Sequence, residues 1–259
     1  MFDLELYAAG LAAALGMAVG GWLVSIPRRD VSIVDSLWSL FFLAMVGVYV
    51  LAGPTSGERA LLVFFLVGVW AVRLSLFITL RNRGQGEDRR YQTIRRNHEP
   101  GFWLKSLYLI FGFQAILAWI ISLPLLGAVL SATPLNWLDY AAVSLWLVGL
   151  FFEAVGDQQL AEFRRDPRNR GQVMDRGLWR YTRHPNYFGE ACIWWGLGLF
   201  ALAGGAWWGL LGPILMTVLL LRVSGVSLLE KDIGERRPGY RDYVARTNAF
   251  FPGPPRGSA

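Results

Sequence analysis

The stretch ALLVFFLVGVWAVRLSLFITL, residues 60–80, carries a single charge, at Arg73, and decides the fold class of the chain. About 20 consecutive apolar residues are enough for an α-helix to cross the hydrocarbon core of a bilayer. Similar runs recur along all 259 residues. We therefore predict an all-α polytopic membrane protein with seven spans, at Leu4–Ile26, Ile33–Leu51, Ala60–Leu80, Trp103–Leu130, Leu138–Phe163, Tyr187–Ala203 and Trp207–Leu229.

The composition excludes several other classes of protein. Hydrophobic residues make up 54% of the chain and charged residues 17%, which is too apolar for one or two soluble domains. The single cysteine, Cys192, excludes a disulfide framework, and only two histidines, His98 and His184, argue against a metal site. The GLG triplet at 196–198 lies inside an apolar run with no preceding strand, so a Rossmann-type dinucleotide loop is excluded too.

The basic residues indicate the orientation of the spans. Lysine and arginine gather in the connections after the first, third and fifth runs and in the C-terminal tail, whereas the other connections and the N-terminus hold only Arg59. Because cytoplasmic loops carry the excess of basic residues, this pattern predicts an outside N-terminus and a cytoplasmic C-terminus. It explains the net charge of +6 without nucleic acid as a partner. We expect the lipid bilayer of a bacterial inner membrane as the environment.

Glycine and proline mark the expected breaks in the helices. Pro124 predicts a kink in the fourth run, and the glycine pair at 204–205 separates the sixth run from the seventh, which Pro213 interrupts in turn. The tail FPGPP at 251–255 is too rich in proline and glycine to be helical. No repeat or linker divides the chain, so we expect one transmembrane domain over residues 1–259.

Ionisable side chains at membrane depth are costly to insert, so they predict functional sites. Glu153 and Asp157 are spaced i, i+4 and share one face of the fifth span. The full set is Asp35, Arg73, Glu153, Asp157, Glu190 and Arg222; all but Glu153, which is one helical turn deeper than Asp157, are expected in the cytoplasmic halves of their spans. Arginines grip phosphates and carboxylates accept ribose hydroxyls, so this set favours a pocket for a ligand with several negative charges. Alternatively, the same charges form ion pairs that only hold the bundle together.

The densest polar segment reads RHPNYFGE, residues 183–190. Pro185 cannot continue a helix but suits its first turn, so the sixth span is expected to begin near Asn186. A helix N-terminus flanked by Arg183 and His184 is typical of an anion site. The alternative is an interfacial anchor, with arginines and aromatic rings at the lipid headgroups.

This segment, followed by the paired tryptophans at 194–195, resembles the C-terminal signature of the steroid 5-alpha-reductase family. Related signatures occur in delta-14 sterol reductases and in isoprenylcysteine carboxyl methyltransferases. The stretch SIVDSLW at 32–38, and the segment from Arg73 to NRG at 82–84, favour the reductase branch. The resemblance covers nearly the full chain, since that family also has seven spans with the N-terminus outside.

The resemblance implies NADPH-dependent reduction of the enone of a 3-oxo-Δ4 steroid or of a similar enone lipid. It assigns residues 1–131 to substrate-side helices and residues 132–259 to cofactor-side helices and cytoplasmic loops. The NADPH contacts that it carries over to this chain are Arg73, Glu153, Asp157, Arg164, Arg176, Arg183, His184, Asn186, Tyr187, Glu190, Trp194, Arg222 and Glu230.

In the same family an acid in the second span and a tyrosine in the third polarise the steroid carbonyl. Asp35 matches the acid, shortened from glutamate, and Val34 stands where the family has glutamine. Trp70 stands at the tyrosine position and cannot donate as a phenol does, so Tyr91 becomes the candidate donor. Trp38 and Trp70 are expected to contact the substrate. Hydride addition to an enone builds negative charge on the carbonyl oxygen, so a hydrogen-bond donor must be aimed there.

Two other functions stay open. A methyltransferase that uses S-adenosylmethionine and acts on a lipid or prenylcysteine shares the signature and the topology. Asp35, Trp38 and the arginine-rich third connection disfavour it. A non-catalytic sterol-binding membrane protein also fits, and it should keep its ligand when Asp35 and Glu190 are both lost.

Overall fold

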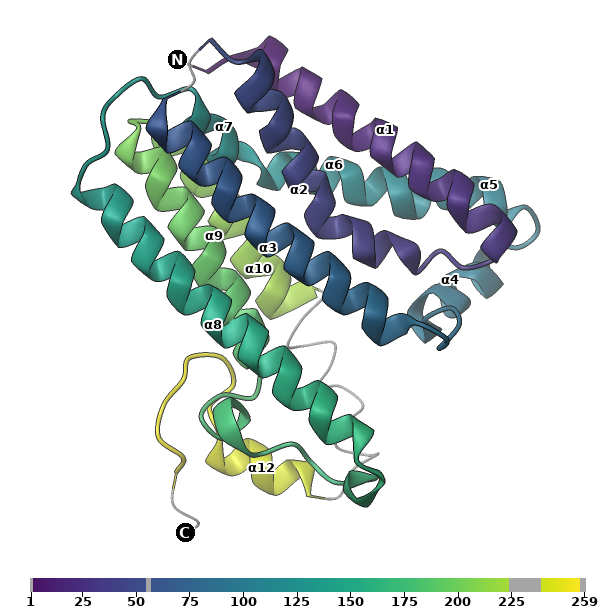
Figure 1. Ribbon diagram of the computed structural model, residues 1–259. Helices are drawn as coiled ribbons and strands as arrows, with labels where there is room; N and C mark the ends of the chain where they lie inside the picture. Colours follow the sequence, from purple (N-terminus) through teal and green to yellow (C-terminus); the bar gives the residue numbers. More distant parts are fainter. Residues whose placement is uncertain (1, 55–56, 224–238, 257–259) are drawn as a thin grey trace. The chain divides into compact units, whose positions relative to one another are not determined.

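The computed structural model describes residues 2–54, 57–223 and 239–256, and every regular element in these ranges is a helix (Figure 1). The three N-terminal helices are α1 (Leu4–Arg28), α2 (Ile33–Ala52) and α3 (Glu58–Asn82). Together with Phe102–Ile121 and α8 (Trp137–Arg165), they are long and apolar enough to cross a membrane. The prediction of an all-α integral membrane protein is therefore confirmed for the described part of the chain.

The chain divides into two compact units. Unit 1 comprises Met1–Asn136 and Phe200–Gly212, and unit 2 comprises Trp137–Leu199 and Pro213–Ala259. The assignment of residues 1–131 to the substrate and 132–259 to the cofactor stays a prediction.

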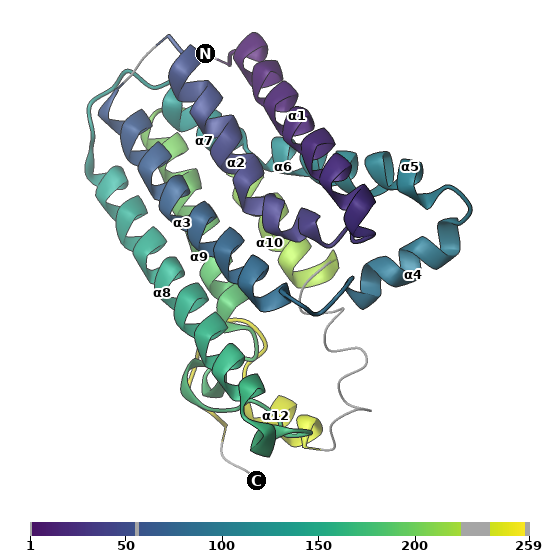
Figure 2. The ribbon, with the colours of Figure 1, turned by 45° about the vertical axis from the view of Figure 1, so that its right-hand side comes forward.

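In unit 1, α1, α2 and α3 lie side by side in chain order, and α6 (Phe113–Ile121) packs against α1 and α2 (Figure 1, Figure 2). The rings of Tyr7 in α1 and Trp119 in α6 stack with centroids 4.2 Å apart. Each of these side chains also donates a hydrogen bond to the backbone carbonyl of the other. Gly10 brings α1 close to α2, because a Cβ there would overlap the ring of Tyr49. These contacts fix α6 in unit 1.

The fourth predicted span has one break, at Ser122. Before it, α5 (Phe102–Ser106), the π-helical turn η1 (Leu107–Gly112) and α6 form one continuous helix, and α7 (Leu123–Val129) follows it. Pro124 lies in the first turn of α7, where a proline leaves no N–H without a partner. The expected break at Pro124 is thus confirmed. The π-helical turn at η1 has no signal in the sequence.

In unit 2, α8 packs closely against α9 (Pro185–Ala203) through glycines. A Cβ at Gly149 would lie 2.6 Å from the carbonyl oxygen of Gly189, and a Cβ at Gly189 would lie 2.5 Å from the backbone nitrogen of Glu153. Small residues allow membrane helices to approach this closely. The start of α9 at Pro185 agrees with the expected beginning of the sixth span.

The glycine pair after α9 ends that helix, as expected. Gly205 has a φ of +84°, a conformation that glycine adopts at no steric cost. The run that follows consists of η4 (Trp207–Leu210), α10 (Leu211–Val218) and the π-helix η5 (Leu219–Val223). Neither α9 nor this run belongs to the five long apolar spans among the described residues, so the count of seven stays a prediction.

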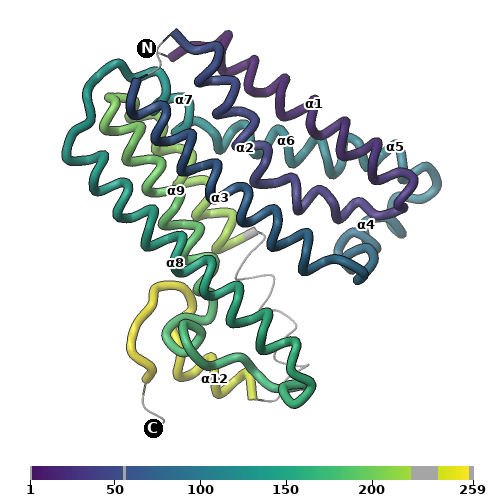
Figure 3. The backbone as a smooth tube through the Cα atoms, viewed as in Figure 1, coloured from purple at the N-terminus to yellow at the C-terminus, as the bar shows by residue number. Residues whose placement is uncertain are grey.

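The remaining parts of unit 2 are short helices and the C-terminal segment. The connection from α8 to α9 contains η2 (Pro167–Asn169) and η3 (Gly177–Arg180), and α12 (Tyr240–Arg246) precedes the tail. Figure 3 shows the tail returning beside the η3 region. The Thr182 hydroxyl donates to the carbonyl of Phe250 at 2.8 Å, and the Gly253 N–H donates to that of Tyr181 at 3.1 Å. The tail is non-helical, as predicted, and it is also bonded to the segment before α9.

Candidate functional site

Tyr91 and Asp35 form a short hydrogen bond in unit 1. Asp35 lies in the first turn of α2, and Tyr91 lies in α4 (Arg89–His98). The Tyr91 hydroxyl donates to Asp35 Oδ1 at 2.5 Å, and Arg90 Nη2 donates to Asp35 Oδ2 at 2.9 Å. The amide of Gln114, in α6, donates to the Tyr91 oxygen at 3.1 Å. The structure therefore brings together the two residues that the sequence analysis assigns to carbonyl polarisation.

Local contacts explain why α4 lies where Tyr91 can reach Asp35. The Ser32 hydroxyl accepts the N–H of Asp88 at 2.7 Å, and the Glu87 carboxylate accepts the N–H of Val31 at 3.0 Å. We call Val31, Ser32, Glu87 and Asp88 the α4 clasp. Because the clasp joins the beginning of α2 to the beginning of α4, it determines which side chains of α4 face α2.

The surroundings of Tyr91 keep its hydroxyl protonated. Burial raises the pKa of Tyr91 far above its ordinary value of 10.0, and the Asp35 carboxylate raises it further.

In the clasp, burial alone would raise the pKa of Glu87. The hydrogen bonds from Arg95 and from the Val31 N–H, together with the charge of Arg95, outweigh burial, so the pKa of Glu87 lies below its ordinary value of 4.5. At neutral pH, Tyr91 is thus a neutral donor and Glu87 an anion paired with Arg95 at 2.7 Å.

The two tryptophans assigned to the substrate belong to one aromatic group. Phe42 meets Trp38 edge-on with centroids 5.3 Å apart, and its centroid lies 5.9 Å from that of Trp70. Trp70 is fully buried within the protein and Trp38 is half-buried. Arg73 is half-buried and lies one turn after Trp70 in α3. Contact of either tryptophan with a substrate stays a prediction.

In unit 2, the two acids of α8 lie beside the start of α9. Glu153 is 2% exposed and Asp157 is 6% exposed. The Asn186 amide donates to Asp157 Oδ1 at 3.2 Å. Trp179 Nε1 donates to the carbonyl of Gly156 at 3.0 Å, which docks the segment before α9 on α8. The acids predicted from their i, i+4 spacing therefore face the segment that the sequence analysis singles out.

Several predicted cofactor residues follow one another along α9. Asn186, Glu190 and Trp194 are spaced four residues apart, so they share one face of the helix. His184 is buried, and its ring stacks on that of Tyr187 with centroids 5.5 Å apart. The structure thus places these five residues in or directly before α9, and one of them, Asn186, contacts an acid of α8.

Arg183 has a contact that the sequence does not predict. Its Nη1 donates to the carbonyl of Thr247 at 2.7 Å, and its backbone N–H donates to the carbonyl of Asn248 at 2.9 Å. The side chain is buried. Arg183, assigned to the cofactor by the resemblance, therefore also anchors the C-terminal segment.

The other predicted cofactor residues lie apart from this group in the chain. Arg164 and Arg176 are exposed. Arg222 is exposed in η5 and borders an apolar pocket of about 490 Å³ that Trp195 and Thr217 also line. Glu230 lies outside the described residues.

Sequence reasoning missed two residues that contact the Asp35–Tyr91 pair. Gln114 is a polar residue within the fourth apolar run, and that position was the signal that could have identified it. Arg90 lies among several other arginines, and nothing in the sequence distinguishes it from them.

Comparison with protein families shows which family the chain belongs to but does not indicate an activity. The model of a family described as a protein of unknown function, DUF1295, matches residues 21–247. The chain belongs to this family. DUF1295 is a membrane family related to the steroid 5-alpha-reductases. An uncharacterized protein of Schizosaccharomyces pombe is 27% identical over 274 residues, which cover 89% of this chain and 75% of that relative. No solved structure matches the chain.

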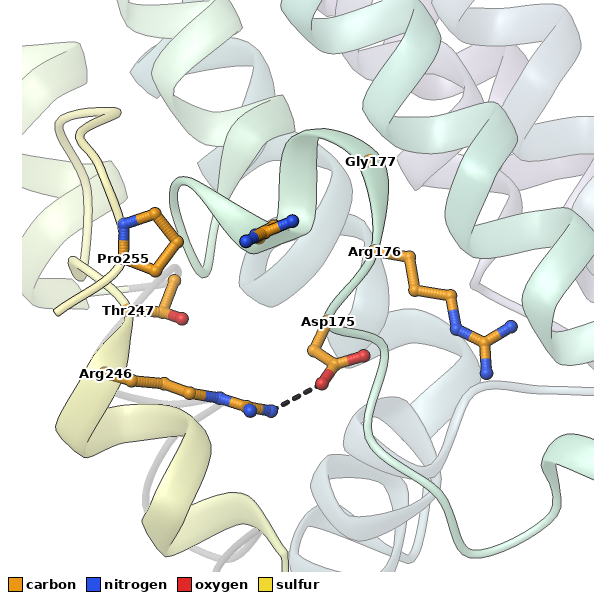
Figure 4. A pocket seen from close by; sticks show the side chains of 7 residues that line it. Asp175, Arg176, Gly177, Arg246, Thr247 and Pro255 are labelled. Carbon is orange, nitrogen blue, oxygen red and sulfur yellow. Dashed lines mark hydrogen bonds and ion pairs between the residues drawn. The ribbon is translucent and has the colours of Figure 1, made fainter. Parts of the chain in front are cut away.

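The region matched by DUF1295 includes the Asp35–Tyr91 pair, the acids of α8 and all of α9. It also includes most of a polar pocket of about 400 Å³ in unit 2 (Figure 4). The residues that line this pocket are Asp175, Arg176, Gly177, Arg180, Arg246, Thr247 and Pro255. Within the described ranges, no three or more His, Cys, Asp and Glu side chains are grouped so that they could hold a metal ion.

Proposed function

We propose that this DUF1295 protein uses NADPH to reduce the carbon–carbon double bond of an enone lipid, such as a 3-oxo-Δ4 steroid. The observation that carries the proposal is the 2.5 Å hydrogen bond between the Tyr91 hydroxyl and Asp35. A phenol that is hydrogen-bonded to a carboxyl group is suited to stabilise a carbonyl oxygen as it becomes negative. The resemblance of the RHPNYFGE segment to the steroid 5-alpha-reductases supports the same reaction class.

The reaction adds a hydride to the β carbon of the enone and a proton, which comes from water, to the α carbon. NADPH supplies the hydride when it is bound. Tyr91 donates a hydrogen bond to the carbonyl oxygen, where negative charge develops. A protonated Asp35 can then donate to the Tyr91 oxygen, and the Gln114 amide already donates to it at 3.1 Å. Both donors make Tyr91 a stronger hydrogen-bond donor toward the substrate.

The chemistry of the side chains in unit 2 fits a dinucleotide. Carboxylates such as those of Glu153 and Asp157 accept hydrogen bonds from ribose hydroxyls and from a carboxamide. Asn186 donates to Asp157, so an amide of this kind is already accepted at that carboxylate. Arginine guanidinium groups suit the phosphates. We assign the acids of α8 to hydroxyl and amide groups, and the exposed Arg164 and Arg222 to phosphates.

The proposed topology has seven spans, with the N-terminus outside and the C-terminus in the cytoplasm of a bacterium. The five long apolar helical segments support the first five spans. We assign the sixth span to α9 and the seventh to the run that begins at η4. The bias of lysine and arginine toward alternate connections supports this orientation.

The experiment uses the full-length protein in lipid nanodiscs, a 3-oxo-Δ4 steroid, and either NADPH or S-adenosylmethionine. We expect the steroid to gain two hydrogens, detected by mass spectrometry, when NADPH is added and not when S-adenosylmethionine is added. Asp35→Asn should abolish this turnover while NADPH still binds. A methylated lipid formed from S-adenosylmethionine, or ligand binding without turnover, would replace the reductase proposal by one of its two alternatives.

A further inference from the structure

The polar pocket of unit 2 contains more positive than negative charge. Its volume of about 400 Å³ lies within the range of small-molecule sites. One wall comes from residues 175–180, and the other comes from Arg246, Thr247 and Pro255 near the C-terminus. Three arginines line it, and Asp175 is the only acid among the lining residues. The pocket is therefore suited to an anion.

The charges within the pocket are arranged so that one arginine stays available. Asp175 is paired with Arg246 at 2.5 Å. Figure 4 shows this pair at the pocket and shows the side chain of Arg176 directed away from it. The Arg180 guanidinium is exposed and makes no hydrogen bond or ion pair with any residue that the structure describes. A ligand anion can therefore reach Arg180 without displacing an acid.

Contacts outside the pocket hold its two walls together. The Gly253 N–H donates to the carbonyl of Tyr181 at 3.1 Å and so joins the two walls, while the Arg256 N–H donates to the carbonyl of Arg246 at 2.8 Å within the C-terminal wall. The buried side chain of Arg183 donates a hydrogen bond to the carbonyl of Thr247. The Tyr243 hydroxyl donates to the carbonyl of Trp179, next to Arg180. Because these bonds fix the backbone on both sides, the pocket is formed before a ligand binds, which lowers the entropy cost of binding.

We propose that this pocket binds a phosphate monoester, with Arg180 as its principal contact. A guanidinium donates two parallel hydrogen bonds to phosphate oxygens, and the nearly double negative charge of a monoester at neutral pH favours it over a singly charged anion. Two sources share the required chemistry: the 2′-phosphate of NADPH and the headgroup of phosphatidic acid. The first source rests on the proposed function, whereas the phosphate site itself rests only on the pocket.

The test uses the full-length protein in phosphatidylcholine nanodiscs and isothermal titration calorimetry. The probe is NADP+, compared with NAD+, which lacks only the 2′-phosphate monoester. We expect Arg180→Gln to weaken binding of NADP+ by at least about tenfold, since one charge-assisted hydrogen bond contributes that much, and to leave the binding of NAD+ unaffected. Arg180→Lys should retain part of the affinity. Arg241→Gln is the matched control, because Arg241 lies in α12 but does not line the pocket.

A second arm uses nanodiscs that contain phosphatidic acid. Loss of phosphatidic acid binding in Arg180→Gln, with no preference of the wild type for NADP+ over NAD+, supports the site with a lipid as its ligand. Equal behaviour of Arg180→Gln and Arg241→Gln in both arms overturns the proposal. If the wild type binds phosphate through Arg180 but does not reduce an enone with NADPH, the proposed function is wrong while the phosphate site is supported.

Discussion

At the scale of single residues, the Tyr91 hydroxyl is the group whose removal tests the chemistry most directly. Tyr91→Phe keeps the buried ring and removes the oxygen that bonds to Asp35 and Gln114. We expect kcat to fall by about 10²–10³-fold, because loss of one donor to a developing oxyanion costs that much. Steady-state reduction of the steroid measures kcat. A separate titration should give an unchanged affinity for NADPH.

The matched control is Tyr108→Phe. Tyr108 is also in unit 1 and is 61% exposed, so removal of its hydroxyl should leave kcat unchanged. If Tyr91→Phe were as active as this control, Tyr91 would have no part in polarising a carbonyl. If both variants lost activity, the loss would reflect damage to unit 1.

The sequence alone was enough to select Asp35 and Tyr91 as the candidate pair, but it did not predict the residues that form hydrogen bonds with them. Asp35 is an acid inside an apolar run, and Tyr91 is a phenol near the start of a cluster of arginines. Gln114 reaches Tyr91 across 23 positions of the chain, and Arg183 reaches Thr247 across 64. Such pairs depend on how helices pack, and neither hydrophobic periodicity nor local spacing encodes that packing.

At the scale of elements, the α4 clasp gives the position of Tyr91 a dependence on pH. The pKa of Glu87 in the folded protein lies below its ordinary value of 4.5. A group with a lowered folded-state pKa stabilises the fold above its unfolded pKa, and this contribution is lost as the pH falls through the folded value. We therefore expect α4 to loosen as the pH falls below about 4.5. Hydrogen exchange of the α4 amides, followed from pH 7 to pH 3, measures this loosening.

Glu87→Gln removes the titrating group and should flatten the dependence of α4 exchange on pH. At neutral pH the same variant should exchange faster than the wild type, because the ion pair with Arg95 is gone. Asp166→Asn is the control, since the pKa of Asp166 is also lowered but this residue pairs with Arg168 in unit 2. If Glu87→Gln kept the full pH dependence of the wild type, the clasp would not hold α4 through this carboxylate.

Elements built on long apolar runs could be predicted, whereas those held by polar contacts could not. The first three spans, the break at Pro124 and the turn at Gly205 follow from run length and from the backbone properties of proline and glycine. Helix α4 lies in a connection rich in arginine, and its position depends on the clasp. The docked tail depends on bonds between side chains and backbone. Neither feature leaves a periodic pattern in the sequence.

At the scale of the whole molecule, the number of crossings between two connections determines whether they lie on the same side of the membrane. Three proposed spans separate Pro54 from Arg168, namely α3, the broken run that contains α6, and α8. An odd number predicts that these two residues lie on opposite sides, and the excess of basic residues predicts that Arg168 lies in the cytoplasm. Both residues are exposed, so each can be replaced by a cysteine that a reagent can reach.

A membrane-impermeant maleimide applied to intact bacterial cells therefore tests the topology. In a Cys192→Ala background, we expect Pro54→Cys to react directly and Arg168→Cys to react only after the cells are permeabilised. The background without cysteine is the control for labelling of other proteins, because Cys192 is the only native cysteine. Direct labelling of both positions in intact cells would mean that the broken fourth run does not cross the bilayer. The phosphate pocket would then face the compartment of the α2–α3 connection, where cytoplasmic NADPH could not reach it.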